Sequence, residues 1–363
     1  MKILTLGLDN SITDGQSDLT RRVLDYGTLV EKYTVIVPAA KNSQVDLSDK
    51  VRVLAVGGCC KFIKLIRIYN LAKKILQQEN FDVISVQDIY YLALVAIILA
   101  KKNKVGLEVQ AHGLEKLSCV RWLVAGYVLS AADAIRAVSQ RLKKQLIVKF
   151  GVKEEKITVV PIYTELGIKS YELREKNIND KFVFLTVGRL VSVKNIGLQI
   201  EAMAELAKKY PKAELWIVGD GQEKENLKLK IENLELNEKI KLLGQKNNNK
   251  LTEIYEIADV FLLTSNQEGW GLAVIEAANH SLSIIMTDVG CAGEVIKNGE
   301  SGLVIPVGDK KMLVAAMSKL ARDSDLRKTL GERAHQAALT LPDKEETARL
   351  YRLSWRKAAN KFK

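Results

Sequence analysis

Two glutamates that flank a glycine-rich turn have the clearest capacity for chemistry in this sequence. Glu268 and Glu276 lie in TSNQEGWGLAVIEAANH, which follows the apolar run DVFLL and continues into a helix-like stretch. Backbone N–H groups at the start of such a helix, here at Gly271 and Leu272, can hold a phosphate. A carboxylate accepts paired hydrogen bonds from sugar hydroxyls. The pattern is therefore typical of a site for a sugar nucleotide.

Two cations occupy a similar place in the segment TVGRLVSVKNIGLQIEAM. Arg189 directly follows a predicted strand, and Lys194 opens a predicted helix. Cations at the carboxyl edge of a parallel sheet would hold a diphosphate and offset the negative charge that grows on it as a glycosidic bond breaks. The run VGDG, residues 218–221, contains Gly219 at another strand end, but it lacks the spacing of a dinucleotide fingerprint.

Short apolar runs alternate with helix-length amphipathic stretches along the chain, and this alternation predicts an α/β protein with parallel sheets. The strands predicted for the first half are KILTLGL, YTVIVP, VRVLAV, FDVISVQ, KVGLEVQ, DAIRAVS and KITVVP. The strands predicted for the second half are FVFLTVGR, AELWIVG, IKLLG, DVFLLTS, SIIMTD and GLVIPV. Each set predicts one doubly wound sheet.

A chain of 363 residues favours two domains. The polar segment TELGIKSYELREKNINDK precedes the strand FVFLTVGR and is the natural place for a linker. We expect a first domain at 1–165, a linker at 166–181, a second domain at 182–342 and a C-terminal helix at 343–363. That last segment repeats its apolar residues at helical spacing.

The four cysteines, at positions 59, 60, 119 and 291, form no CxxC pair and accompany no histidine cluster. The sequence therefore predicts neither a zinc site nor a disulfide framework. The start MKILTLGLDN reads as a strand rather than a signal peptide. The longest apolar stretches, 91–100 and 122–132, are shorter than the roughly 18 to 20 residues that a membrane-spanning helix needs. We expect a cytoplasmic protein, with the inner face of the membrane as a further location.

In order and in spacing, Arg189, Lys194 and the Glu-x7-Glu pair resemble the signature of glycosyltransferase family four. The segments AELWIVGDGQEKENL, LTEIYEIADVFLLTS and GESGLVIPVGD are similar to that family's C-terminal domain, and QAHG and AVSQRLKKQL to its N-terminal domain. The resemblance implies the GT-B fold, with two Rossmann-like, doubly wound parallel-sheet domains facing across a cleft. The N-terminal domain would bind the acceptor and the C-terminal domain the nucleotide sugar, and the C-terminal helix would cross back to the N-terminal domain.

The same resemblance implies roles for individual residues. Glu276 would hold the ribose of the nucleotide, Arg189 and Lys194 the diphosphate, and Glu268 hydroxyls of the donor sugar. His112, in QAHG, matches a cleft histidine near the donor sugar and the reaction centre. Glu268, His112, Arg189 and Lys194 are thus the expected catalytic set.

The resemblance further implies a retaining reaction in which the departing phosphate accepts the proton of the acceptor hydroxyl. Such a reaction needs no enzyme nucleophile and no DxD metal motif, so we expect no metal and no cofactor besides the nucleotide sugar as substrate. Gly219, Gly271 and Leu272 would contact the donor nucleotide. His280 and His335 fall inside helical stretches and are expected to be structural.

The sequence departs from the family pattern in two places. Where the family often has a Gly-Gly loop after the first strand, this chain has SITDGQS, in which Gly15 is the candidate contact to a donor phosphate or the acceptor. Where many members have Pro-Asn-Gly-Val-Asp, this chain has PIYTE at residues 161–165. The second change affects only an expected hinge.

The net charge of +12 suits anionic partners without choosing among them. The stretch CCKFIKLIRIYNLAKKILQQ, residues 59–78, interleaves basic and apolar residues. It suits a helix that packs on the sheet with a solvated basic face, and as a further hypothesis peripheral contact with an anionic membrane. Family habit and charge together favour a lipid-linked glycan or a surface polysaccharide precursor as acceptor.

Two rival functions remain open. A GT-B sugar-nucleotide epimerase would share the architecture, but it would need its own acid and base pair and no acceptor. A basic nucleic-acid-binding protein would account for the charge. The sequence shows no RNA- or DNA-binding motif and only 6% aromatic residues, so we expect no nucleic-acid partner.

Overall fold

The computed structural model describes residues 1–15, 17–114, 119–164 and 181–362 and divides into two compact units. Unit 1 comprises Met1–Pro161 and Pro342–Lys363, and unit 2 comprises Ile162–Leu341. These limits fall beside the domain ends expected at residues 165 and 342. The linker expected at 166–181 lies outside the described residues, apart from Lys181.

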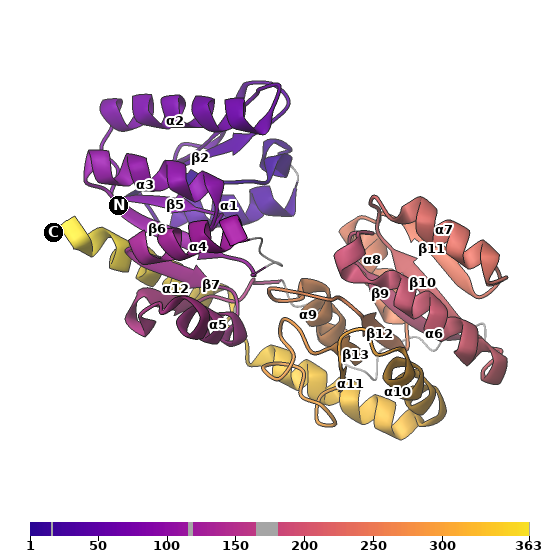
Figure 1. Cartoon of the computed structure of the whole chain (residues 1–363). Helices are drawn as coiled ribbons and strands as arrows, with labels where there is room; N and C mark the ends of the chain where they lie inside the picture. Colours follow the sequence, from indigo (N-terminus) through magenta and orange to yellow (C-terminus); the bar gives the residue numbers. More distant parts are fainter. Residues whose placement is uncertain (16, 115–118, 165–180, 363) are drawn as a thin grey trace. The chain divides into compact units, whose positions relative to one another are not determined.

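Unit 1 is built on an eight-stranded sheet with the order β3-β4-β2-β1-β5-β6-β7-β8 (Figure 1). The strands are β1 (Lys2–Leu6), β2 (Lys32–Pro38), β3 (Ser43–Ser48), β4 (Val51–Val56), β5 (Val83–Val86), β6 (Gly106–Ala111), β7 (Ala134–Ala137) and β8 (Ile157–Val159). Strands β5, β6 and β7 are buried along their whole length. Burial on both faces explains why such strands appear in the sequence as continuous apolar runs.

The edge strand β3 is not among the strands predicted from the sequence, and it adds an antiparallel strand to an otherwise parallel sheet. β3 runs antiparallel to β4, with Val45 opposite Val53. Its residues are exposed or half-buried, and its sequence SQVDLS is too polar to be recognised as a buried strand. An antiparallel edge strand on an otherwise parallel sheet is common, because hydrogen bonds to one neighbour are enough to hold it.

Helices cover both faces of this sheet (Figure 1). They are α1 (Asp18–Thr28), α2 (Lys61–Gln78), α3 (Tyr91–Asn103), α4 (Cys119–Ala131), α5 (Gln140–Phe150) and α12 (Lys344–Ala359), with short 3-10 helices at Asn10–Thr13, Glu154–Lys156 and Asn360–Phe362. Because α3 and α12 both pack on β5 and β6, they lie on opposite faces. Helix α3 also packs against α2 and α4 on its own face.

The C-terminal helix α12 belongs to unit 1, as the resemblance implies. Its Trp355 is fully buried in the core of this unit. Its Ser354 donates a hydrogen bond to the buried carboxylate of Glu108. Glu108 also faces the guanidinium of Arg136 at 3.4 Å, and that guanidinium stacks over the ring of Tyr351 on α12, 3.7 Å from its centroid. A buried charge pair is thus enclosed and partly satisfied by the last helix of the chain.

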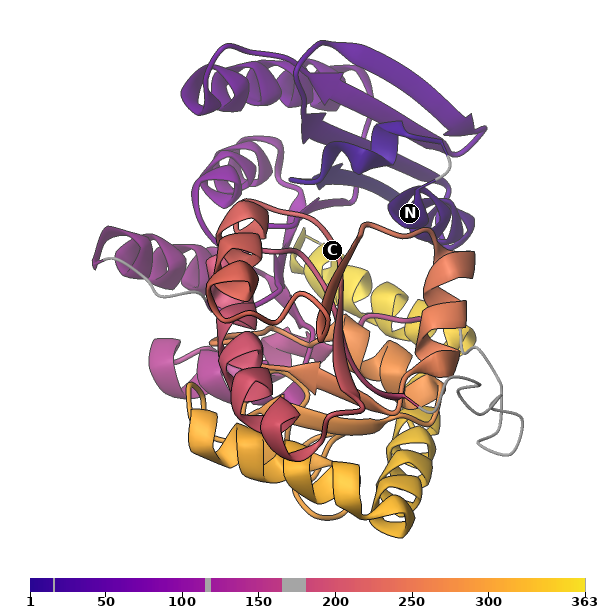
Figure 2. The same cartoon turned by 90° about the vertical axis from the view of Figure 1, so that its right-hand side faces the viewer.

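Unit 2 contains a parallel six-stranded sheet with the order β11-β10-β9-β12-β13-β14 (Figure 2). The strands are β9 (Phe182–Val187), β10 (Ala213–Val218), β11 (Ile240–Gly244), β12 (Val260–Leu263), β13 (Ser283–Thr287) and β14 (Leu303–Ile305). The helices are α6 (Ile196–Lys209), α7 (Lys224–Asn233), α8 (Asn248–Ile257), α9 (Leu272–Asn279), α10 (Lys310–Arg322) and α11 (Ser324–Leu339), with a 3-10 helix at Ser192–Lys194. Helix α6 packs against α7 and α10, while α9 packs against α11. All six strands predicted for this half are present.

Replacing Trp355 with alanine should destabilise unit 1, because the ring is fully buried and its loss leaves a large cavity. We expect the free energy of unfolding to fall by about 3 to 5 kcal/mol, measured by denaturant titration of the whole chain. Leu353→Ala is the matched control on the same helix. Leu353 is 38% exposed, so its truncation should cost less than about 1 kcal/mol. Equal losses for the two variants would contradict this account of how α12 is held.

Candidate donor site

Lys194 and Glu268, one predicted cation and one predicted carboxylate, meet in the loops that follow β9 and β12. Strand β9 lies between β10 and β12, so the chain leaves β9 in one direction and later returns to β12 on its other side. In open α/β sheets, ligands bind at such a switch point. Hydrogen bonds join the loops there: the backbone N–H of Asn266 donates to the Val193 carbonyl (2.8 Å), and the Thr264 hydroxyl donates to the Asn195 carbonyl (3.1 Å).

Lys194 and Glu268 form an ion pair at this point. The Lys194 ammonium lies 2.5 Å from Oε1 of Glu268, and the Ser265 hydroxyl donates to the same oxygen at 2.7 Å. The side chains are 21% and 13% exposed, so both remain accessible from one side while the pair is shielded from most of the solvent. A cation and an acceptor of hydroxyl hydrogen bonds are therefore held side by side by residues that lie 74 positions apart.

The turn between Glu268 and α9 is pressed against the segment that follows β13. Trp270 is buried, and its carbonyl accepts the amide N–H of Cys291 at 2.9 Å. A side chain at Gly290 would begin 2.5 Å from that carbonyl, so only glycine allows this approach. Gly271 has a φ of +92° and leaves the first turn of α9 without a side-chain cap. The N–H groups at a helix start without a side-chain cap are suited to an anion, and their binding of a phosphate stays a prediction.

Glu276 lies on α9, and its Oε2 accepts a hydrogen bond of 2.9 Å from the hydroxyl of Tyr255 on α8. Tyr255 is buried and stacks on the ring of His280, with 5.1 Å between centroids. Burial, followed by the negative charge of Glu276 and their hydrogen bond, raises the pKa of Tyr255 well above 10. The phenol therefore stays protonated and fixes one oxygen of the carboxylate.

The remaining predicted residues of unit 2 differ in their surroundings. Arg189 is exposed just after β9. Gly219 follows β10 with a φ of +141°, and a side chain there would begin 1.9 Å from the Gly188 carbonyl. This close backbone contact is sufficient to explain a glycine at position 219 without a ligand. His280, stacked on Tyr255, and His335, whose Nδ1 lies 3.3 Å from the Ala278 carbonyl, have the packed surroundings expected of structural histidines.

His112 and Gly15 belong to unit 1. His112 directly follows β6, and its side chain is exposed within the described chain. Desolvation and then the positive charges of Arg136 and Arg22 lower the pKa of His112 below its usual value, so the imidazole is neutral at pH 7. Water still reaches this exposed ring, and this contact reduces the effect of desolvation on the pKa of His112. Gly15 lies in the loop after β1 with open space around it. The predicted joint action of His112 and Glu268 stays a prediction.

Two residues of the candidate donor site were not found by sequence reasoning. Ser265 and Tyr255 each hold one of the two carboxylates, yet neither lies at a spacing that would announce the contact. Ser265 follows β12 three residues before Glu268, which was the one available signal. Tyr255 lies on α8, 21 residues before Glu276, and only the tertiary fold of unit 2 brings the two side chains together.

Within the described part of the chain, no group of three or more His, Cys, Asp or Glu side chains is placed to hold a metal ion. The same residues include no helix that is long and apolar enough to cross a membrane. The expectation that the reaction needs no metal stays a prediction.

Replacing Gly219 with alanine should destabilise unit 2, because its side chain would collide with the Gly188 backbone. We expect a loss of about 1 to 3 kcal/mol in the free energy of unfolding, measured by thermal and denaturant titration. Gly15→Ala is the control, since nothing lies within 4 Å of the added carbon. If Gly219→Ala kept full stability and lost only ligand binding, the residue would be a ligand contact rather than a structural glycine.

Two family models match this chain and together span both units. Residues 32–162 match the model described as Glycosyltransferase Family 4, and residues 170–337 match Glycosyl transferases group 1. Among curated proteins, the capsular polysaccharide biosynthesis glycosyltransferase CapM of Staphylococcus aureus is 30% identical over 222 residues, which is 58% of each chain. The N-acetyl-alpha-D-glucosaminyl L-malate synthase of Bacillus anthracis is 25% identical over 282 residues, 73% of this chain and 71% of that protein.

Solved structures show the same fold at lower identity. HepE of Anabaena, in complex with UDP and glucose, has a TM-score of 0.77 at 18% identity and covers 97% of this chain and 98% of its own. The sucrose-phosphate synthase of Thermosynechococcus elongatus has a TM-score of 0.80 at 19% identity, over 97% and 99% of the two chains. With the sequence signature, the two Rossmann-like units and the matches to both family models, the chain belongs to the GT-B glycosyltransferases of the family-four type.

Proposed function

We propose that this glycosyltransferase moves a sugar, with retention of configuration, from a nucleoside diphosphate sugar to an acceptor hydroxyl. The single observation that carries the proposal is the Lys194–Glu268 pair at the switch point of unit 2. It sets a cation and a hydroxyl-binding carboxylate in adjoining positions, just as the diphosphate and the sugar adjoin in such a donor. The proposed reaction is independent of metal ions and requires no cofactor.

The other residues extend the same arrangement. Glu276 would bind the ribose hydroxyls with its carboxylate, which Tyr255 holds in place. The exposed guanidinium of Arg189 and the ammonium of Lys194 would bind the diphosphate from the β9 side. The uncapped N–H groups of Gly271 and Leu272 would contact it from the start of α9. Each donor group then has a partner of opposite charge or matching hydrogen-bond capacity.

In the proposed reaction the bond between the anomeric carbon and the phosphate oxygen breaks. The acceptor oxygen bonds to the same face of that carbon, and its proton passes to the departing phosphate. Arg189 and Lys194 lower the barrier by stabilising the negative charge that develops on the leaving diphosphate. Glu268 and the neutral imidazole of His112 would orient the donor sugar and accept or donate hydrogen bonds to it. No side chain has to act as a strong base.

A lipid-linked glycan or a surface polysaccharide precursor is the acceptor class that we propose. The relatives favour it: CapM takes its name from capsular polysaccharide biosynthesis, and LpsE of Rhizobium meliloti, 28% identical over 157 residues, from lipopolysaccharide core biosynthesis. HepE, which binds UDP and glucose, makes UDP sugars the first donors to test. A place of action in the cytoplasm, at the inner face of the membrane, is part of this proposal.

The two rivals differ from this proposal in their products. An epimerase would convert the nucleotide sugar without an acceptor, so a new nucleotide sugar in an acceptor-free reaction would favour it. A nucleic-acid-binding protein would retard RNA or DNA in a gel at moderate salt. Neither outcome is expected.

Glu276→Ala should weaken the binding of the nucleotide diphosphate, because the ribose loses its carboxylate partner. We expect one nucleotide of a panel to raise the melting temperature of the wild type, with an apparent Kd about tenfold or more weaker in the variant. Glu253→Ala is the control in the same unit, since Glu253 is an exposed partner of Lys250 on α8. Equal stabilisation of wild type and Glu276→Ala by that nucleotide would place the ribose elsewhere.

Lys194→Met should slow transfer more than it weakens donor binding, because the charge it stabilises is largest in the transition state. We expect kcat to fall about 100- to 1000-fold, measured as release of nucleoside diphosphate in the presence of acceptor. Lys250→Met, a 64% exposed lysine on α8, should retain the wild-type rate. A rise in KM with an unchanged kcat would contradict a role in leaving-group stabilisation.

A further inference from the structure

Four helices on one face of unit 1 have a formal charge equal to that of the whole protein. Helices α2, α3, α4 and α5 together have twelve Lys and Arg and no Asp or Glu. Removing these twelve from the 55 Lys and Arg of the chain leaves 43, which equals the number of Asp and Glu. The charges of the rest of the protein sum to zero, so the four helices together have the same formal charge as the whole chain, +12.

These four helices share one face of the eight-stranded sheet. Helix α3 packs on β5 and β6 and α5 on β7 and β8, opposite α12, which packs on the same four strands. Helix α2 packs on β2 and β4 and against α3, which in turn packs against α4. Figure 1 shows α2, α3, α4 and α5 following one another across this side of unit 1. We call this surface the α2–α5 face.

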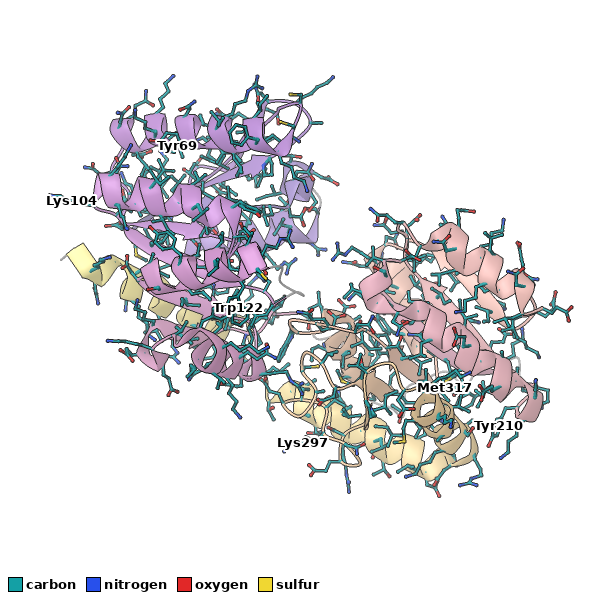
Figure 3. All side chains as sticks on the ribbon, in the orientation of Figure 1. Tyr69, Lys104, Trp122, Tyr210, Lys297 and Met317 are labelled. Carbon is teal, nitrogen blue, oxygen red and sulfur yellow. The ribbon has the colours of Figure 1, made fainter. Side chains whose placement is uncertain are left out.

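Large apolar side chains are exposed on the same α2–α5 face. Phe62 on α2 is 70% exposed, Leu123 on α4 is 73% exposed and Val148 on α5 is 83% exposed. The further exposed members are Ile66, Tyr91, Ile98, Val120, Trp122 and Tyr127. Tyr69 on α2 and Trp122 on α4 are labelled in Figure 3. Exposed apolar side chains concentrated on one face mark an interaction surface rather than ordinary surface variation.

The local contacts show how the two kinds of side chain are combined. Trp122 stacks on Phe150 with 4.3 Å between ring centroids, which fixes an aromatic platform at the junction of α4 and α5. The ammonium of Lys101 lies 5.8 Å from the ring centroid of Tyr127, and that of Lys102 lies 3.2 Å from the Tyr69 hydroxyl. Among the described residues, no carboxylate pairs with Lys73, Lys74 or Lys101. Their positive charge is thus available to a partner.

We propose that the α2–α5 face docks on an anionic lipid bilayer. Lysine and arginine are attracted to acidic headgroups, while Phe, Leu, Val and Trp side chains enter the boundary between headgroups and acyl chains. A nucleic acid or another soluble polyanion would use the positive charge but not the exposed Phe62, Leu123 and Val148. A protein partner would be expected to bind a surface that contains both acidic and basic side chains. The combination of acid-free helices and exposed apolar residues fits the bilayer best.

This inference defines a surface that residues 59–78 alone do not reveal. Helix α2 buries Ile68, Ala72, Ile75 and Leu76 against the sheet, so it is both a packed helix and part of the proposed docking surface. The inference is independent of the donor site, because vesicle binding is measured without nucleotide sugar. Its failure would leave the proposed transfer reaction untouched.

The test is flotation of the whole protein with vesicles of phosphatidylcholine alone or with added phosphatidylglycerol. The charge variant carries Lys73→Glu, Lys74→Glu, Lys101→Glu and Lys102→Glu, all at exposed positions. Its matched control carries Lys208→Glu, Lys228→Glu, Lys311→Glu and Lys319→Glu, which are exposed on helices of unit 2 and change the net charge equally. Thermal unfolding checks that each variant is folded.

We expect the wild type and the unit 2 variant to bind phosphatidylglycerol vesicles within about twofold of each other, and the charge variant to bind at least about tenfold more weakly. Binding of the wild type should fall as salt is raised. Equal binding to both kinds of vesicle, or equal loss in both lysine variants, would overturn the proposal. Phe62→Ser with Leu123→Ser should weaken vesicle binding at constant charge, and an unchanged value would indicate a soluble polyanion instead.

Discussion

The central position of β9 in the sheet of unit 2 controls where the charged residues of the donor site lie. Because β10 flanks β9 on one side and β12 on the other, the loops that leave β9 and β12 start next to each other and turn apart. Lys194 comes from one loop and Glu268 from the other, and a backbone hydrogen bond from Asn266 to Val193 joins the two loops. The chemistry of the site follows from this topology more than from any single side chain.

The two carboxylates of the site are positioned in physically different ways. Glu268 is held by the ammonium of Lys194 and the hydroxyl of Ser265, so its charge is balanced locally. Oε2 of Glu276 accepts a hydrogen bond from the phenol of Tyr255, which stays protonated. A protonated tyrosine positions an anion without neutralising it.

Unit 1 separates its charges into an internal pair and an external excess. Glu108 and Arg136 are buried beneath α12, where Ser354 and Tyr351 supply a hydrogen bond and a ring face. Breaking such a buried pair would leave an uncompensated charge, which explains why the last helix of the chain is needed to complete the first unit. On the opposite face, α2 to α5 contain Lys and Arg and no Asp or Glu of their own, although Lys143 on α5 pairs with Glu154 just beyond that helix. The two faces of this sheet therefore differ in charge: one covers a buried ion pair, and the other exposes positive side chains.

The sequence by itself determined the strands that are buried on both faces, the two Rossmann-like halves and the Arg, Lys and Glu-x7-Glu signature. Buried parallel strands are continuous apolar runs, and residues at their carboxyl ends must share one edge, so local pattern was sufficient. It did not determine β3, whose polar residues are stabilised by hydrogen bonds to a single neighbour. Nor did it determine Tyr255, the structural need for glycine at 219, or the common face of α2 to α5. Each of these depends on which distant segments pack together, and sequence periodicity within one segment contains no information about that choice.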